Sequence, residues 1–290
     1  MPQEIVIPAG EAPKRLENFL KKHFNIGYVR KLFRKNGVRL NGKHAAAEDI
    51  ARPGDRIQLY IPYEKSKPGA RPAGELDIVF EDDEVLVLNK PSGIAVHEGK
   101  GILKRDTILG RLEAAYRSRG IAPKLVHRID KDTSGLLVAA KNDQTAERLE
   151  RLFDTGDVEK EYLALVAGRL PAKRDTIDAP LPGREGRPVT AVTHYKAERE
   201  FPGAVLARVR IDTGRMHQIR LHFASIHHPV VMDDEHGDFA FNKEFRKKFG
   251  LKRQFLHASM IAFEHRGKMR KWTAELPEDL ARTLERLERS

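Results

Sequence analysis

The segment LVHRIDKDTSGLLVAAK (Leu125–Lys141) passes within a few residues from a cluster of charged side chains to an unbroken apolar run. The run Leu136–Ala140 predicts a buried strand, because a short apolar stretch after a Thr-Ser-Gly turn is typical of one. The polar residues just before the turn are His127, Arg128, Asp130, Lys131 and Asp132. Charges packed against a buried strand are costly unless they are paired or functional. Asp130 therefore either caps the following turn or belongs to a functional site.

A second segment, IDTGRMHQIRLHFA (Ile211–Ala224), is rich in polar side chains. We expect a helix near Met216–Ile226, after the Thr-Gly turn. His217 and Arg220 would then share one helix face, and Arg220 could meet a carboxylate such as Asp130. The alternative is an ordinary helix with scattered polar residues, which the density of histidine, glutamine and arginine disfavours.

Two further segments carry candidate site residues. EKEYLALVAG (Glu159–Gly168) predicts an apolar strand, in which Tyr162 either packs in the core or points into a cleft. EDDEVLVLNKPSGIAVH (Glu81–His97) predicts a buried strand that is followed by Asn89–Gly93. Loops after buried strands often contact phosphates or line a site, so Asn89–Gly93 is a candidate for either role.

Elsewhere, strands and helices are mixed irregularly, without a regular βαβ repeat. The expected strands are Ile78–Phe80, Val85–Leu88, Leu136–Ala140, Tyr162–Val166, Leu206–Ile211 and Ile261–Glu264. The expected helices are Thr107–Arg119, Gln144–Phe153, Met216–Ile226 and Leu280–Glu288. This arrangement predicts an α+β fold with a mostly antiparallel sheet for residues 75–290.

The first 71 residues hold 15 Lys and Arg against 7 Asp and Glu, and so most of the excess positive charge. Helices are expected at Arg15–Phe24 and Tyr28–Lys35. The second helix would turn four basic side chains toward solvent: Arg30, Lys31, Arg34 and Lys35. Val38–Leu40 meets Asn41-Gly42, which favours a tight hairpin. We expect a small basic α/β domain at residues 1–64.

A linker is expected at residues 65–74, because KSKPGARPAG (Lys65–Gly74) is rich in proline, glycine and charge. A larger domain would then occupy residues 75–290. The N-terminal MPQEIVIPAG has no basic stretch followed by an apolar run, so no signal peptide is expected. The apolar runs fall short of the roughly 18 residues that a membrane span needs. We therefore expect a soluble, cytoplasmic protein without a membrane partner.

The composition narrows the possible partners and chemistry. Lys and Arg total 53 against 42 Asp and Glu, giving a net charge of +11. Such an excess attracts polyanions, so nucleic acid is the leading partner, with charge for solubility as the alternative. The absence of cysteine excludes disulfides, thiolate chemistry and cysteine-containing zinc sites.

Almost the whole chain resembles the RluA-type pseudouridine synthase family with an N-terminal S4-like RNA-binding domain. The matching motifs are NKPSG (Asn89–Gly93), HRIDKDTSGLLV (His127–Val138), EKEYLALV (Glu159–Val166), TGRMHQIRLH (Thr213–His222) and LHA (Leu256–Ala258). In the first domain, RLENFL (Arg15–Leu20), VRKLFRKNGVRLNGK (Val29–Lys43) and PGDRI (Pro53–Ile57) are similar to an S4 domain. Three segments look closest to the large-subunit rRNA synthases of the C type: EDDEVLVLNKPSGIAVH (Glu81–His97), DDEHGD (Asp233–Asp238) and FNKEFRKKFGLKRQFLHA (Phe241–Ala258).

The resemblance implies a site. Asp130 would be the catalytic aspartate, Arg220 its partner, and Tyr162 the side chain against the target base. Arg128 would fill the space left by the flipped nucleotide. In the S4-like domain, the implied RNA contacts are Arg30, Lys31, Arg34, Lys35 and Arg39. Two positions depart from the family pattern: Ile129 stands where leucine is usual, and His236 stands where tyrosine is usual.

The implied reaction is the isomerisation of uridines in 23S ribosomal RNA. The substrate would be the free RNA or an assembling large ribosomal subunit, and the enzyme is expected to be a monomer. No organic cofactor is expected, because the reaction needs no redox step or electron sink. No metal is expected either, because the spacing of His217, His222, His227, His228 and His236 reproduces no HExxH or zinc-ribbon pattern. Two alternatives are a non-catalytic S4-type RNA-binding protein and a hydrolytic N-glycosidase.

Overall fold

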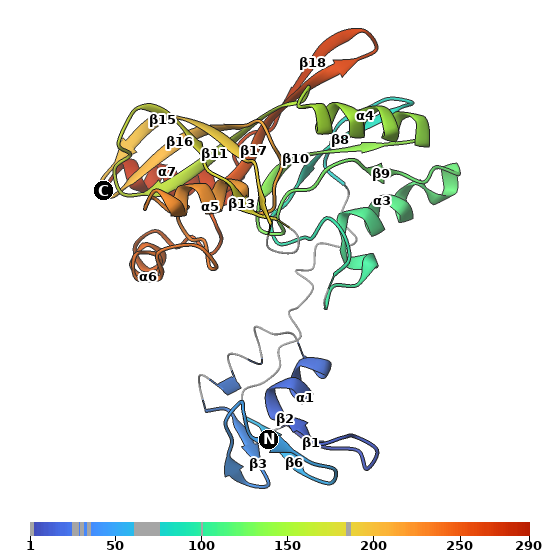
Figure 1. Cartoon of the computed structure of the whole chain (residues 1–290), viewed down its shortest axis with the longest axis vertical. Helices are drawn as coiled ribbons and strands as arrows, with labels where there is room; N and C mark the ends of the chain where they lie inside the picture. Colours follow the sequence, from blue (N-terminus) through green and yellow to red (C-terminus); the bar gives the residue numbers. More distant parts are fainter. Residues whose placement is uncertain are drawn as a thin grey trace. The chain divides into compact units, whose positions relative to one another are not determined.

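The computed structural model describes residues 3–24, 29, 32–33, 36–60, 76–99, 101–183 and 187–290. The chain divides into two compact units, Met1–Gly74 and Glu75–Ser290 (Figure 1). Each unit is described by itself. Among the described residues, no helix combines the length and the apolar composition that a membrane span requires.

The first unit is a small antiparallel sheet with the strand order β1-β6-β3-β4, and a separate β2-β5 pair. Its elements are β1 (Gln3–Val6), β2 (Lys14–Arg15), α1 (Leu16–His23), β3 (Val38–Leu40), β4 (Lys43–His44), β5 (Ile50–Ala51) and β6 (Arg56–Leu59). Helix α1 buries Leu16, Phe19 and Leu20. The predicted hairpin at Asn41-Gly42 is present, with both residues at positive φ, +51° and +82°, as a tight two-residue turn requires.

The RNA contacts predicted for this unit stay predictions. The prediction that Arg30, Lys31, Arg34 and Lys35 form a basic face falls on residues outside the described part of the chain. Arg39 is described: it lies on β3, with its guanidinium 4.7 Å from the ring centre of Tyr60. The S4-like assignment stays a prediction.

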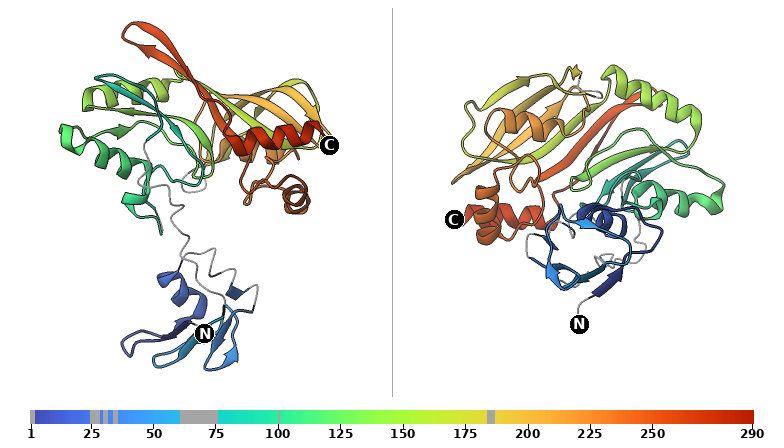
Figure 2. Two further views of the ribbon diagram at one scale, coloured as in Figure 1. Left: turned by 180° about the vertical axis from the view of Figure 1, so that it is seen from behind. Right: turned by 60° about the horizontal axis from the view of Figure 1, so that its bottom comes forward.

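The second unit contains a ten-stranded sheet. Eight strands follow the order β12-β15-β16-β11-β17-β10-β8-β7, and the other two are β18, which pairs with β17, and β9, which pairs with β10. Among its described strand pairs, β10–β17 is parallel and the others are antiparallel, which confirms the predicted fold class. The strands are β7 (Ile78–Glu81), β8 (Val85–Lys90), β9 (Lys124–Leu125), β10 (Ser134–Ala140), β11 (Glu159–Ala167), β12 (Arg174–Asp178), β15 (Val192–Phe201), β16 (Ala204–Ile211), β17 (Leu256–His265) and β18 (Lys268–Thr273). A short pair, β13 (Leu181–Pro182) and β14 (Pro188–Val189), lies apart from it. Figures 1 and 2 show the β17–β18 ribbon extending past the neighbouring strands.

Helices pack on both faces of this sheet, because its central strands are apolar on both sides. On β10, Leu137 and Ala139 belong to the same core cluster as residues of α3 (Ile108–Tyr116) and α5 (Gln218–Ser225), whereas Leu136 and Val138 share a cluster with α4 (Asp143–Thr155) on the other face. Helices α6 and α7 pack on the same face as α4, where it is formed by β11 and β16. The helices are α3 (Ile108–Tyr116), α4 (Asp143–Thr155), α5 (Gln218–Ser225), α6 (Phe239–Phe249) and α7 (Glu278–Glu288), with short 3-10 turns at Lys104–Asp106 and Arg117–Arg119.

Several elements were not predicted from the sequence: α6, β9, β12, β15, β18 and the β13–β14 pair. Strands β12 and β18 each bury one residue, so they lack the apolar pattern that indicates a strand. Helix α6 did carry a signal, since Phe241, Phe245 and Phe249 follow one another at four-residue spacing.

Gly135 explains why the central strand pair forms where it does. It lies at φ +111°, and a Cβ atom there would be 2.2 Å from the backbone oxygen of Ala258 on β17. Only glycine permits this close approach between β10 and β17. The charged segment before β10 is thereby placed at the middle of the sheet, where the loop of residues 126–133 meets α5.

Candidate active site

Asp130 and Arg220 meet beside the start of β10, as the sequence predicts. The NH1 group of Arg220 donates a hydrogen bond of 3.2 Å to Oδ2 of Asp130. The Asp130 side chain is 18% exposed and that of Arg220 is 5% exposed, so the pair is open on the side of the aspartate. The following turn is closed by the Thr133 amide and the backbone oxygen of Asp130, which leaves the carboxylate free of a capping role.

Asp233 is the main partner of Arg220, and sequence reasoning missed it. The guanidinium donates two hydrogen bonds to this carboxylate, from Nε at 2.6 Å and from NH2 at 2.8 Å. Asp233 is completely buried. Burial opposes its charge, but the hydrogen bonds and charge of Arg220 outweigh that penalty and hold the pKa of Asp233 below its usual value. Likewise, burial opposes the charge of Arg220, but Asp233 and Asp130 raise the pKa of that side chain.

The Asn89–Gly93 motif anchors the loop that carries Asp130. Lys90 is buried, and its Nζ donates to the backbone oxygens of Pro91, Ile94 and Lys131, each at 2.9 Å. Ser92 donates to the backbone oxygen of Asp132 at 2.9 Å. The Lys90 Nζ group already has three backbone acceptors, so this side chain holds the loop together. The phosphate-contacting role considered for the Asn89–Gly93 motif stays a prediction.

Lys90 is also electrostatically unusual. Burial lowers its pKa to about 7, against the opposite effect of the Asp132 carboxylate. From the other side, Arg253 donates to the backbone oxygen of Asp132 at 3.4 Å and to Oγ of Ser134 at 3.2 Å. The loop after Asp130 is therefore held at the start of β10 from both sides, by Lys90 at the end of β8 and by Arg253 just before β17, which fixes the position of the carboxylate.

Tyr162 lies on β11, opposite Ala258 of β17, and is 8% exposed. Burial raises the pKa of its phenol, and the charge of Asp130 raises it further. The phenol therefore stays protonated at neutral pH, near enough to Asp130 to be affected by its charge. This favours a role for the ring surface over a role as a base.

His127 and Arg128 face different surroundings, although they are neighbours. Nε2 of His127 accepts a hydrogen bond of 2.9 Å from the Val138 amide, and its ring stacks on Phe153 at 4.5 Å. Burial lowers the pKa of His127 to about 3, so its role is structural. Arg128 is exposed. The pKa of His97 is lowered mainly by burial of that imidazole and, to a smaller extent, by the charge of Arg128.

His217 does not belong to the predicted helix. Its φ is +54°, and α5 begins one residue later. The reason is the Gln218 side chain, whose Oε1 accepts hydrogen bonds from the Arg215 amide and from Thr213 Oγ1 and so fixes a turn before the helix. Burial lowers the pKa of His217, although the charge of Asp130 opposes this.

The histidines that were considered as metal ligands lie in different surroundings. His222 is buried between Thr193 Oγ1 at 2.8 Å and the Ala179 backbone oxygen at 2.9 Å. His228 bonds the backbone oxygen of Ala167. His217 and His236, however, lie 3.0 Å apart, and Glu235 is beside them. Sequence spacing concealed this group, because its members come from two segments.

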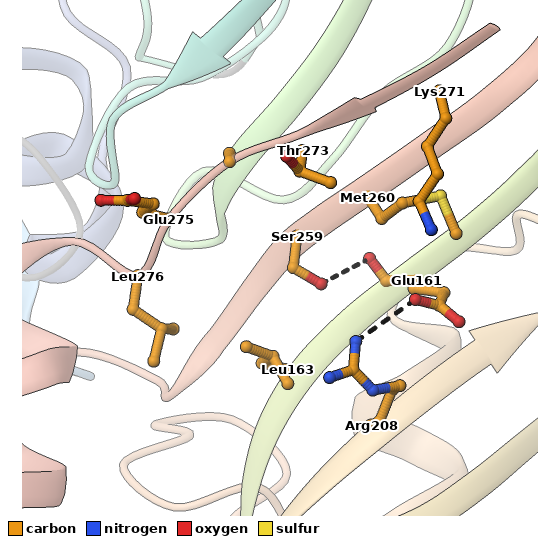
Figure 3. A pocket seen from close by; sticks show the side chains of 10 residues that line it. Glu161, Leu163, Arg208, Ser259, Met260, Lys271, Thr273, Glu275 and Leu276 are labelled. Carbon is orange, nitrogen blue, oxygen red and sulfur yellow. Dashed lines mark hydrogen bonds and ion pairs between the residues drawn. The ribbon is translucent and has the colours of Figure 1, made fainter.

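A separate hollow of about 340 Å³ lies on the other face of the sheet (Figure 3). Glu161 and Leu163 line it, and along β11 they alternate with Tyr162, whose side chain packs on the opposite face. In the hollow, Arg208 pairs with Glu161 at 3.3 Å. This hollow is therefore distinct from the Asp130 site.

Comparison with known proteins identifies the family. The model of the family described as RNA pseudouridylate synthase matches residues 84–225. "Ribosomal large subunit pseudouridine synthase C" of Vibrio vulnificus is 36% identical, over 91% of this chain and 89% of its own length. The Escherichia coli protein of that name is 34% identical, over 98% and 96% of the two chains. "Uncharacterized RNA pseudouridine synthase YlyB" of Bacillus subtilis is 34% identical, over 99% of both.

A solved structure has the same fold. "Human RNA Pseudouridylate Synthase Domain Containing 4" aligns with a TM-score of 0.63 at 23% identity, over 73% of this chain and 92% of its own. The fold, the extent of the sequence match and the family model agree with one another. The chain therefore belongs to the RluA-type pseudouridine synthases, which are isomerases that convert uridine to pseudouridine.

Proposed function

We propose that this enzyme isomerises specific uridines of 23S ribosomal RNA, with Asp130 as the catalytic residue. The observation that carries the proposal is the partly open Asp130 carboxylate paired with the buried Arg220 at 3.2 Å. The RNA class is inferred from relatives whose names specify the large ribosomal subunit. Free RNA or a partly assembled subunit would serve as substrate, in the cytoplasm, with the enzyme acting as a monomer.

The target base must leave the RNA stack before it can reach Asp130, at a cost of a few kcal/mol. The exposed Arg128, two residues before the aspartate, is suited to occupy the vacated space and contact the phosphate backbone. In the first unit, Arg39 and the basic residues Arg30, Lys31, Arg34 and Lys35 would add sequence-independent affinity for RNA. This part of the proposal rests on charge and on the S4-like sequence pattern.

The reaction exchanges one bond for another within the nucleotide. The bond from ribose C1′ to N1 of uracil breaks, the base rotates, and a bond from C1′ to C5 forms; the proton of C5 is lost and N1 gains one. Asp130 starts the reaction as a carboxylate, by attack on the sugar or by removal of a sugar proton. Arg220 pairs with that carboxylate and orients it, and the Tyr162 ring holds the detached base by stacking.

The test uses purified full-length protein and a 23S ribosomal RNA transcript. We expect pseudouridine at defined positions, and loss of the same positions from cellular RNA when the gene is deleted. Free uracil among the products would indicate an N-glycosidase instead. RNA binding without either product would support the non-catalytic alternative, and modification confined to another class of RNA would contradict the 23S assignment.

A further inference from the structure

Three side chains beside the Asp130–Arg220 pair converge on one point, and the proposed reaction does not use them. Nδ1 of His217 is 3.0 Å from Nε2 of His236 and 3.5 Å from Oε2 of Glu235. The third distance, from His236 Nε2 to Glu235 Oε2, is 3.9 Å. Two imidazole nitrogens and one carboxylate oxygen therefore form a compact triangle.

The triangle has the dimensions of one face of a tetrahedral metal site. Zinc binds imidazole nitrogen and carboxylate oxygen at about 2.0–2.1 Å, so neighbouring ligand atoms are about 3.4 Å apart. Each observed distance is within about half an ångström of that value. Two histidines and one glutamate also form a known three-ligand zinc set, which leaves the fourth position for water or substrate.

The surrounding charge favours a cation. Arg220 faces three carboxylates, those of Asp130, Asp233 and Glu235, at 3.2, 2.6 and 3.3 Å. With neutral imidazoles, the three carboxylates and the one guanidinium carry an excess of two negative charges. The chain as a whole, in contrast, has a net charge of +11. A divalent ion would neutralise that excess.

The backbone holds the three ligands in place from both sides. The amides of Glu235 and His236 each donate to Oδ1 of Asp233 at 3.0 Å, so the same buried carboxylate orders both residues. His217 has a left-handed backbone conformation, which costs about 1 kcal/mol or more and persists only where the surroundings enforce it. The second nitrogen of His217, Nε2, faces Oδ1 of Asp130 at 3.9 Å.

We propose that His217 Nδ1, His236 Nε2 and Glu235 Oε2 bind Zn²⁺, and that the bound ion inhibits the enzyme. Binding needs unprotonated nitrogen at both ligand positions, so the imidazole protons move to His217 Nε2 and His236 Nδ1 without net loss. His217 Nε2 then carries a proton that faces Oδ1 of Asp130 at 3.9 Å, and an approach of about 1 Å makes it a donor to this carboxylate, as histidine ligands of zinc commonly are.

The inhibitory effect rests on the proposed function of Asp130. The ion takes Glu235 away from Arg220, adds a hydrogen-bond donor to the Asp130 carboxylate, and places two positive charges beside it. Each change stabilises the resting carboxylate and makes it a poorer nucleophile or base.

Zinc binding is measured first, independently of activity. Calorimetry with ZnCl2 on full-length, chelator-treated protein should give one tight site. The variants Glu235→Gln and His236→Tyr should weaken it by at least about 10- to 100-fold. The control His44→Gln removes an exposed histidine of the first unit and should leave the affinity unchanged. Thermal melting without zinc identifies any variant that fails to fold.

Cobalt substitution gives a second readout, because tetrahedral Co²⁺ absorbs strongly in the visible region. We expect that band in wild type and its loss in His236→Tyr. No binding by wild type, or equal affinity in the folded variants, would overturn the site.

If zinc binds without slowing pseudouridine formation, the inhibitory role is wrong and the site stands. An enzyme inactive even when zinc-free would refute the proposed function alone, since binding is scored separately.

Discussion

Asp233 binds Arg220 through two hydrogen bonds of 2.6 and 2.8 Å, whereas the bond from Arg220 to Asp130 is longer, at 3.2 Å. Asp233 is fully buried and Asp130 is partly open. The guanidinium is thus held by a buried carboxylate, and its NH1 group donates to a carboxylate that is partly exposed. Asp130 is therefore paired and still partly accessible, as the proposed catalytic role requires.

Asp233→Asn should destabilise the protein by about 3 kcal/mol, because it places an amide donor against the donors of a buried guanidinium. Urea unfolding measures the loss. Asp234→Asn is the matched control, since this neighbouring side chain is exposed and should change stability by less than about 0.5 kcal/mol. Equal effects of the two substitutions would show that the buried pair contributes little.

Asp130→Asn should bind RNA as wild type does and form pseudouridine at least about 10³-fold more slowly, because the amide cannot act as a nucleophile or base. Single-turnover assays on a transcript measure the rate, and filter binding measures affinity. Asp154→Asn, on an exposed position of α4, serves as the control. Turnover by Asp130→Asn at the wild-type rate would refute the assigned role.

Tyr162→Phe should retain more activity than Tyr162→Leu. The raised pKa of the phenol keeps it protonated, so the ring surface is the part that we expect to matter. Loss of base stacking in the leucine variant should cost about 1–3 kcal/mol, or roughly 5- to 150-fold in rate. If both variants are equally impaired in single-turnover assays, the hydroxyl takes part in proton transfer.

His127 makes stability depend on pH. Its pKa is about 3 in the folded protein and about 6.5 in the unfolded chain, so below pH 6.5 the unfolded chain binds the extra proton. Stability should therefore fall as the pH falls from 6.5 toward 3, by about 2 kcal/mol between pH 6.5 and 5.

His127→Gln removes this titration and keeps an acceptor for the Val138 amide. Urea unfolding at pH 7.5 and 5.0 should show a smaller decrease for the variant than for wild type. Other titrating groups are common to both proteins and cancel in the comparison. Parallel pH profiles would mean that His127 accepts a proton in the folded state at its ordinary pKa.

Removal of residues 1–74 should weaken RNA binding and make its salt dependence shallower, because fewer phosphates are then neutralised. The slope of log affinity against log salt concentration is measured between about 50 and 200 mM salt. Arg39→Gln should reduce the slope by about 1 if its guanidinium contacts phosphate. A slope unchanged by the deletion would contradict the S4-like assignment.

Much of this enzyme was predictable from local patterns. Short apolar runs predicted β8, β10, β11 and β16 because each buries its side chains on the central sheet, and Asn41-Gly42 predicted its hairpin through the backbone freedom of those residues. Strands β12 and β18 escaped prediction because each buries a single side chain, so packing neighbours rather than their own pattern make them strands.

The sequence by itself determined the family, the fold class and the pairing of Asp130 with Arg220, because these depend on motifs and on which segments can be buried. Only the tertiary structure decided that Lys90 anchors the Asp130 loop, that Asp233 is the principal partner of Arg220, and that His217, Glu235 and His236 converge. Those contacts join separate segments through loops without regular spacing. Their geometry depends on how the loops fold around the central strands, and no local pattern of residues predicts that folding.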